Sequence, residues 1–258
     1  MEENKLTGQG FWEEYWDDKP GNKKAARTSL LIKEILSAFD AYLPRKEGLS
    51  LLEIGGASGE YLIYLTRKFR YSAHSLDYSH LGNVRTLETF QKAGMEVQVY
   101  ERDLFADNSD LPKFDIVYSL GFIEHFDNPG EVVRCHLDLL KPGGILMLGV
   151  PNYGGIYRFV LKRMAPSIGQ THNLKTMDLK NWSVFEQDFP ISTVFKGYIG
   201  GFEPLNMKKM EADTLLNRLI YFKIRVLMTL FSFHFRWLRK FNSRLWSGYL
   251  LGIYRKKA

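Results

Sequence analysis

Short apolar runs alternate with amphipathic segments through most of the 258-residue chain. The runs at 49–54, 71–76 and 96–100 have the length and composition of buried strands. Between the first two runs, apolar residues in the segment 60–69 recur at helical spacing. This alternation predicts an α/β domain. Four further runs complete the predicted strands, at 115–118, 145–150, 195–199 and 248–256.

The stretch from Leu49 to Leu62 reads as a strand, a tight glycine turn and the start of a helix. Gly55 and Gly56 end the apolar run, and Gly59 precedes the next amphipathic segment. Glycine suits such a turn because the backbone adopts unusual dihedral angles and lies against a ligand with no Cβ between them. The helix N-terminus then offers free N–H groups to ligand oxygens. The stretch predicts the βα unit of a site for a nucleotide-like cofactor.

A carboxylate, Glu53, lies inside this strand, where it would repel the pyrophosphate that a dinucleotide fold binds with G-x-G-x-x-G. A nicotinamide-dependent oxidoreductase is therefore disfavoured. The order Glu53-x-Gly55-x-Ala57-x-Gly59 resembles E-x-G-x-G-x-G, the first motif of the class I S-adenosylmethionine-dependent methyltransferases, with alanine at the middle glycine. The resemblance implies that Glu53, Gly55, Gly56, Ala57 and Gly59 line the cofactor site.

Two further acidic positions match the same family. Asp77 ends the second predicted strand, 22 residues after the first glycine of the turn, and the resemblance implies that it binds the ribose hydroxyls while Tyr78 packs on the adenine. The alternative is that Asp77 or Ser79 only caps the next helix. Asp103 and Leu104 follow the third strand, where family members contact the adenine amino group and ring.

The resemblance covers residues 49–152. Leu120, near the end of the fourth strand, joins the predicted cofactor site. A helix beginning at Pro129 is expected to run to Lys141 and to stop at the Pro-Gly-Gly sequence that follows. The family implies a Rossmann-like α/β fold. Its seven-stranded, mostly parallel sheet would carry helices on both faces, with N-terminal helices and a helical insertion before the last strand.

This fold divides the chain into four predicted parts. Residues 1–47 would form N-terminal helices, in which the aromatic face of 9–18 either packs on the domain or acts as a lid. Residues 48–204 would form the core, whose part after Asn152 builds the substrate side with Tyr153, Tyr157, Arg158, Arg163, His172 and Trp182, among others. Residues 205–246 would be a basic amphipathic insertion, and 247–258 the closing strand.

Charge is distributed unevenly between these parts. Of the 35 Lys/Arg and 29 Asp/Glu residues, 12 and 2 fall in 205–258 and the remaining 23 and 27 in 1–204. The segment 215–241 has a wide apolar side and a basic stripe, but its longest uncharged run, 226–235, is too short to span a bilayer. It fits a helix lying on an anionic membrane, or one packed on the domain or in a homodimer. A nucleic-acid groove is disfavoured because the aromatic residues lie within the apolar side.

The remaining composition favours the cytoplasm, with peripheral attachment to the inner face of a membrane as an extension of that prediction. The single cysteine, Cys135, excludes an internal disulfide framework. The acidic N-terminal stretch lacks the apolar core of a signal peptide.

The catalytic candidates are Glu124 and His125, beyond the fourth strand, and His172 in the substrate region. A general base would remove the acceptor's proton during methyl transfer, and a histidine suits that role near neutral pH. The alternative is that these residues only orient loops and backbone. Some relatives bind a divalent metal through E-x-x-E-H, but the first position here is Gly121, so no metal is predicted.

The sequence therefore predicts a methyltransferase that uses S-adenosylmethionine, leaves S-adenosylhomocysteine and methylates a small molecule. The branch it resembles includes enzymes of ubiquinone and menaquinone biosynthesis and of sugar or natural-product methylation, which favours an oxygen acceptor. A lipid-linked or membrane-associated acceptor would explain the basic insertion. The competing hypothesis is a membrane- or partner-docking protein with a relic cofactor domain.

Overall fold

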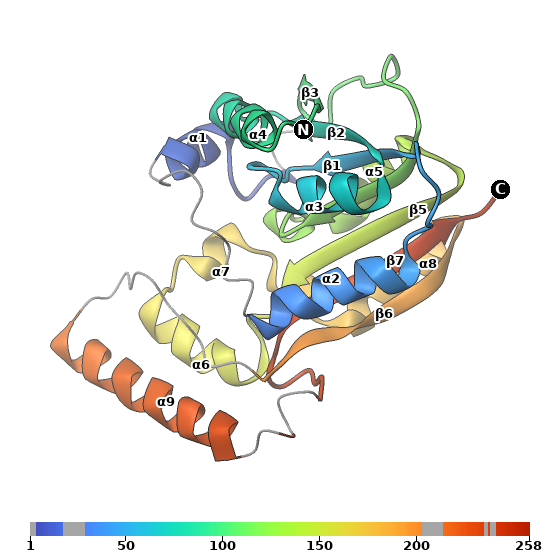
Figure 1. Ribbon diagram of the computed structural model, residues 1–258. Helices are drawn as coiled ribbons and strands as arrows, with labels where there is room; N and C mark the ends of the chain where they lie inside the picture. Colours follow the sequence, from blue (N-terminus) through green and yellow to red (C-terminus); the bar gives the residue numbers. More distant parts are fainter. Residues whose placement is uncertain (1–3, 18–28, 203–213, 235–236, 238–240) are drawn as a thin grey trace.

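The computed structural model describes residues 4–17, 29–202, 214–234, 237 and 241–258. A seven-stranded sheet with the order β3-β2-β1-β4-β5-β7-β6 lies at its centre (Figure 1). Only β7 runs antiparallel to its neighbours β5 and β6, so the predicted mostly parallel sheet is confirmed. The strands are β1 Ser50–Ile54, β2 Ser72–Asp77, β3 Gln98–Glu101, β4 Phe114–Leu120, β5 Leu140–Pro151, β6 Ile191–Phe202 and β7 Ser247–Lys256.

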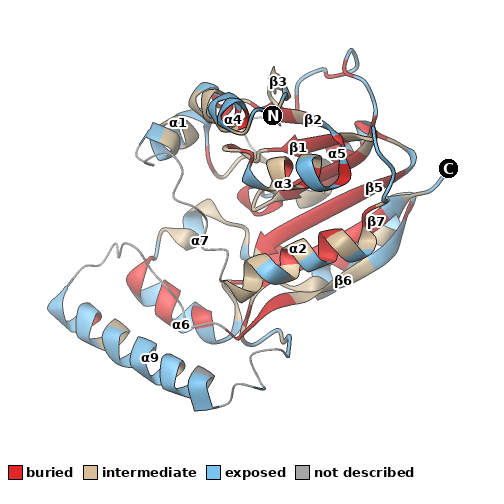
Figure 2. Ribbon diagram, viewed as in Figure 1, coloured by how far each residue is buried: buried red, intermediate tan, exposed pale blue. Residues whose placement is uncertain are grey.

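Helices cover both faces of the sheet. Side chains alternate in direction along each strand, so each strand contributes residues to a core on either face. Leu51 belongs to a core formed with α2 (Leu30–Tyr42), α3 (Glu60–Phe69) and α4 (His80–Lys92). Its neighbour Leu52 belongs to a second core, formed with α5 (Pro129–Asp138) and α8 (Ser183–Asp188). The inner strands β1, β4, β5 and β7 are mostly buried between these layers (Figure 2), whereas the edge strand β3 and much of the edge strand β6 are exposed or half-buried.

The other helices lie outside these layers. The helix α1 (Gln9–Asp17) lies beside α4, while α6 (Gly155–Met164) and α9 (Leu215–His234) lie side by side away from the sheet (Figure 1). The short helices are α7 Ile168–Thr171, η2 Ile123–His125, η3 Leu174–Met177 and η4 Leu179–Trp182. None of the helices in the described ranges is long and apolar enough to cross a membrane.

Two predicted boundaries are wrong. The helix expected to reach Lys141 ends at Asp138, and the following Leu-Lys-Pro-Gly-Gly sequence begins β5. The strand accommodates it with a register shift opposite the start of β4; a Cβ at Gly144 would lie 2.9 Å from the backbone oxygen of Asp115. The helix expected to reach Phe241 ends at His234, and part of that insertion (205–213, 235–236 and 238–240) lies outside the described residues.

We expect replacement of Trp182 by alanine to lower the free energy of unfolding by about 3–5 kcal/mol. The Trp182 side chain is buried between α8 and the sheet, and its Nε1 donates a hydrogen bond to the backbone oxygen of Thr176 (2.7 Å). Urea unfolding would measure the change, with the exposed Val184→Ala as control. A loss below about 1 kcal/mol would contradict this packing.

Candidate active site

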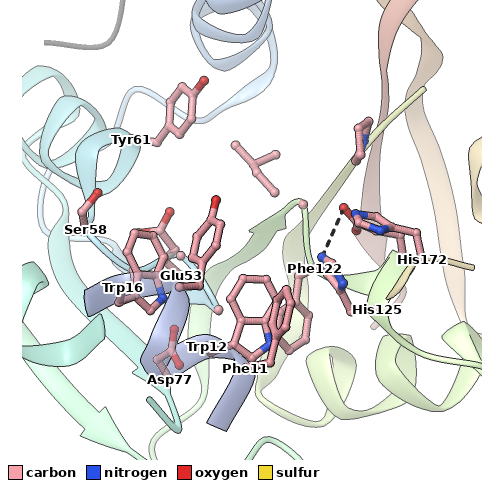
Figure 3. A pocket seen from close by; sticks show the side chains of 18 of the residues that line it. Phe11, Trp12, Trp16, Glu53, Ser58, Tyr61, Asp77, Phe122, His125 and His172 are labelled. Carbon is pink, nitrogen blue, oxygen red and sulfur yellow. Dashed lines mark ion pairs between the residues drawn. The ribbon is translucent and has the colours of Figure 1, made fainter. Parts of the chain in front are cut away.

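A cavity of about 550 Å³ opens at the C-terminal ends of β1, β2 and β4, the place where α/β sheets bind ligands. Glu53 and Tyr61 lie across it from His125 and His172 (Figure 3). A smaller cavity of about 30 Å³ adjoins it and shares Gly55, Asp77 and Tyr78, among others. Of the predicted cofactor residues, Glu53, Gly55, Gly56, Ala57, Asp77, Tyr78 and Leu120 line the larger cavity, and Asp103 and Leu104 line the smaller one.

The glycine turn has the backbone that its sequence predicted. Gly55 and Gly59 adopt φ of 64° and 65°, in the left-handed region that disfavours other residues. A Cβ at Gly56 would lie 2.0 Å from Cδ of Glu53, so the turn and this carboxyl group are packed against each other. Ala57 is almost buried, and a small side chain fits there. Gly59 itself does not line the cavity but precedes α3 as its N-cap.

Glu53 is suited to a polar or cationic ligand group. Its side chain is buried, and burial raises the pKa of its carboxyl group to about 8. Its Oε2 has no hydrogen-bond partner within the described part of the chain. A buried, unpaired oxygen beside a cavity is costly unless a ligand satisfies it, so Glu53 fits the polar end of an S-adenosyl cofactor.

Asp77 is left available to a ligand because Ser79 caps the next helix. The Ser79 hydroxyl accepts a hydrogen bond from Gly82 N (3.0 Å) at the start of α4. The Asp77 carboxylate accepts a hydrogen bond from Ser79 N through Oδ1 (2.9 Å), and burial raises its pKa to about 6. The smaller cavity differs, since the Asp103 carboxylate that lines it already pairs with Lys5.

The N-terminal segment covers both cavities. Leu6 N donates to the backbone oxygen of His125 (2.9 Å), and Gln9 Nε2 donates to that of Tyr78 (2.8 Å). The Glu13 carboxylate accepts from two backbone N–H groups at the start of α4. These bonds hold α1 so that four of its rings line the larger cavity: Phe11, Trp12, Tyr15 and Trp16.

The three catalytic candidates come together on one wall of the cavity. His125 Nδ1 donates to the backbone oxygen of Thr171 (2.8 Å), which brings the rings of His125 and His172 to 4.5 Å between centroids. His125 Nε2 lies 3.9 Å from Glu124 Oε1. Trp12 packs edge-on against His125 at 5.0 Å.

Burial sets the protonation of this group. It lowers the pKa of His172 to about 4 and, together with the neighbouring His172, lowers that of His125 to about 4. Burial also raises the pKa of Glu124 to about 8. At neutral pH the two imidazoles are therefore uncharged, and the Glu124 carboxyl group carries its proton.

The same three residues have the geometry to hold a metal. One ligand atom from each of Glu124, His125 and His172 lies within 4.8 Å of the others. The expectation of no metal rested on Gly121, which removes one ligand of the family motif. The structure adds His172 from a distant segment, and sequence spacing could not have indicated that.

Other lining residues were not expected from the sequence. Tyr61 on α3, Phe122 after β4 and Tyr249 on β7 all line the larger cavity. The substrate side contains fewer of the expected residues, because Tyr153 and His172 line the cavity but Trp182 lies in the core. Tyr157 is buried too, while Arg158 and Arg163 are exposed on α6. The sequence does not record the strand register and helix phase that decide which of these side chains line the cavity and which are buried in the core or exposed.

The fold has the features of the class I S-adenosylmethionine-dependent methyltransferases. The sheet order, with an antiparallel seventh strand, the glycine turn after β1 and the carboxylate ending β2 are all present. A model of the methyltransferase-domain family matches residues 24–196, and the chain belongs to that family. The family assignment favours an enzyme over the relic cofactor domain.

Curated relatives agree with this assignment. The 27-O-demethylrifamycin SV methyltransferase of Amycolatopsis mediterranei is 28% identical over 161 residues, 59% of this chain and 57% of the relative. The ubiquinone biosynthesis O-methyltransferase of Caulobacter vibrioides is 30% identical over 153 residues, 54% and 58% of the two chains. The chain thus spans less than two thirds of the length of these relatives.

Solved structures share the fold. A methyltransferase from Thiobacillus denitrificans, solved with S-adenosylhomocysteine, has a TM-score of 0.57 at 15% identity and covers 97% of this chain and 99% of its own. A methyltransferase from Haloferax volcanii, solved with the Trm112 activator, has a TM-score of 0.60 at 15% identity, covering 96% and 98%. Both likenesses concern the fold alone.

We expect Asp77→Ala to weaken S-adenosylhomocysteine binding about 10- to 100-fold, as befits hydrogen bonds to a charged group. Affinity of the unaltered protein should also fall as the pH drops through about 6, because a protonated carboxyl group accepts fewer hydrogen bonds. Calorimetric titration would measure both, with the exposed Asp188→Ala as control. Unchanged affinity in Asp77→Ala would remove Asp77 from the site.

Proposed function

We propose that this protein transfers the methyl group of S-adenosylmethionine to a hydroxyl oxygen of a small-molecule acceptor. The observation that supports this most directly is the neutral pair of buried His125 and half-buried His172, in the wall of the same cavity that contains the glycine turn. An uncharged imidazole can take the proton that a hydroxyl group loses on methylation. Of the two curated relatives named above, one is named a ubiquinone biosynthesis O-methyltransferase and the other a methyltransferase of 27-O-demethylrifamycin SV.

Different residues of the cavity would bind the cofactor and accept the proton. Bound S-adenosylmethionine supplies an electrophilic methyl group on a sulfonium. Glu53 and Asp77 would hold the polar end and the ribose of the cofactor, while Asp103 and Leu104 would contact the adenine once Lys5 gives way. His125 Nε2 would accept the proton, since Nδ1 is committed to the backbone oxygen of Thr171. The resulting imidazolium would lie beside Glu124, and its positive charge would lower the pKa of that carboxyl group, which carries a proton before the reaction.

The acceptor would be neutral or cationic near the reacting atom. The larger cavity is lined by Glu53, Glu60, Asp77 and Glu124, with no Lys or Arg among its described lining residues. Carboxylate or phosphate groups on an acceptor would find no cation there, whereas aromatic rings line much of the wall. A hydroxylated ring on a lipid-linked or membrane-associated molecule fits these walls.

The helix α1 would act as a lid over this reaction. Its rings line the cavity although none of its residues is buried. Gln9 of the helix bonds to the loop after β2, and Leu6, which precedes the helix, bonds to the loop after β4. Closing this helix over both substrates would exclude water from the methyl transfer. For location we propose the cytoplasm, with peripheral attachment to the inner face of a membrane as the route to a lipid-linked acceptor.

Transfer of labelled methyl groups to a panel of phenols and aliphatic alcohols would test the proposal, with NMR of the product to locate the methyl group. We expect an O-methyl product, and His125→Ala should lower its rate about 10²- to 10⁴-fold. The affinity for S-adenosylhomocysteine should stay within about twofold of the unaltered protein, because His125 is not assigned to the cofactor. Methylation at nitrogen or carbon, or full activity of His125→Ala, would refute the assignment.

Chelation distinguishes the general base from a metal at the same residues. We expect protein treated with EDTA to keep its methyl-transfer rate, and added Mg²⁺ or Zn²⁺ to change it less than about twofold. NMR titration of the histidine Cε1–H signals should show His125 neutral down to about pH 5, since its pKa lies near 4. Rate loss on chelation, restored by one cation, would favour a metal centre at Glu124, His125 and His172.

A further inference from the structure

The outer face of α9 exposes an unusual amount of apolar surface. Leu215 is 75% exposed and Phe233 73%, values expected of polar residues in a soluble helix. We define the outer face of α9 as the side chains Leu215, Leu216, Leu219, Phe222, Val226, Leu227, Leu230 and Phe233, all of them exposed. Figure 2 shows that exposed residues run along the whole helix.

The opposite side of α9 holds the helix on the protein. Asn217 is buried and accepts a hydrogen bond from Arg163 Nε of α6 (2.8 Å). The ring of Phe231 packs edge-on against Phe202 at the end of β6, 5.3 Å between centroids. Packing on the domain therefore accounts for one side of α9 and leaves the outer face uncovered.

Charge favours an anionic partner for this face. The helix α9 carries Arg218, Lys223 and Arg225, and neither α9 nor the adjoining α6 contains an Asp or Glu. The helix α6 adds two exposed apolar side chains of its own, Ile156 and Phe159, and further basic residues. A second copy of the chain would bring these like charges together, which disfavours a dimer through this face.

We propose that the outer face of α9 binds the surface of an anionic lipid bilayer, with the helix lying in the plane of the membrane. The apolar side chains would enter the boundary between headgroups and acyl chains, and the basic side chains would contact the lipid phosphates. The helix is not apolar enough to cross the bilayer. A helix lying in the plane of the membrane is the arrangement in which both the apolar outer face and the basic side chains would contact the bilayer.

This docking would place the substrate wall close to the bilayer. The chain leaves α6 at Met164, forms α7 and reaches His172 at once, so the helix that holds α9 continues into the wall of the cavity. A lipid-linked acceptor could then reach the cavity without leaving the membrane entirely. This last consequence rests on the proposed function, whereas the docking itself does not.

Co-sedimentation with vesicles tests the docking on the full chain. We expect binding to vesicles that contain phosphatidylglycerol, and much weaker binding to phosphatidylcholine alone. The double variant Phe222→Glu/Leu230→Glu should bind the anionic vesicles at least about tenfold more weakly. Lys223→Glu/Arg225→Glu should lose most of the preference for anionic lipid. Leu87→Glu, on an exposed apolar residue of α4, is the matched control and should bind normally.

Two measurements keep the outcomes separate. Calorimetric titration of S-adenosylhomocysteine should give equal affinity for all these variants, which shows that they fold. Failure of the unaltered protein to bind the cofactor product would count against the proposed function alone. Failure to bind vesicles at low salt would overturn the docking. A stable dimer in sedimentation velocity that Phe222→Glu/Leu230→Glu dissociates, without vesicle binding, would also overturn it in favour of a second copy.

Discussion

The backbone of the turn between β1 and α3 is the constraint on which the active site depends. At Gly55 a Cβ would lie 2.1 Å from the ring of Phe122, and at Gly56 it would meet the Glu53 side chain. The loop after β4 can therefore pack onto the turn only while position 55 lacks a side chain, and Glu53 keeps its place only while position 56 lacks one. That loop carries Glu124 and His125. The same two glycines thus shape the cofactor side of the cavity and set the position of the residues proposed for acid–base chemistry.

Burial then determines the chemistry that this arrangement can perform. The cavity concentrates carboxyl groups and aromatic rings and keeps its two imidazoles out of water. Burial raises the pKa of the Glu53 and Glu124 carboxyl groups to about 8 and that of Asp77 to about 6, so Asp77 is ionised at neutral pH while Glu53 and Glu124 mostly keep their protons. A cationic sulfonium bound here would favour the ionised carboxylates, whereas an anionic ligand would find no Lys or Arg among the described lining residues. The pocket is in this sense selective by charge before any shape is considered.

The sequence predicted those features of the fold that depend on residues close together in the chain. Glu53 and the glycines share one strand and one turn, so neighbouring residues reveal their role. The sequence could not predict contacts between residues that are far apart in the chain. His125 lies next to His172 because its Nδ1 bonds to the backbone oxygen of Thr171. Tyr249 reaches the cavity from the last strand. The helix was expected to continue to Lys141, just before Pro-Gly-Gly, but it ends at Asp138 because Leu140 pairs with Phe114 of β4 instead. The periodicity of α9 indicated an apolar face, but only packing could show which side was left exposed.

The position of β7 has a consequence for how the protein is made. This strand inserts between β5 and β6, and it contributes Tyr249 to the cavity. Until the ribosome has delivered residues 247–256, the edge of β5 remains unpaired and β6 has no neighbour in the sheet. Strands that pair across such long sequence separations form slowly, and until they pair, their unpaired edges are exposed and prone to aggregation. A nascent chain of this protein would therefore depend on protection by chaperones late in synthesis, and its binding cavity would be the last part to form.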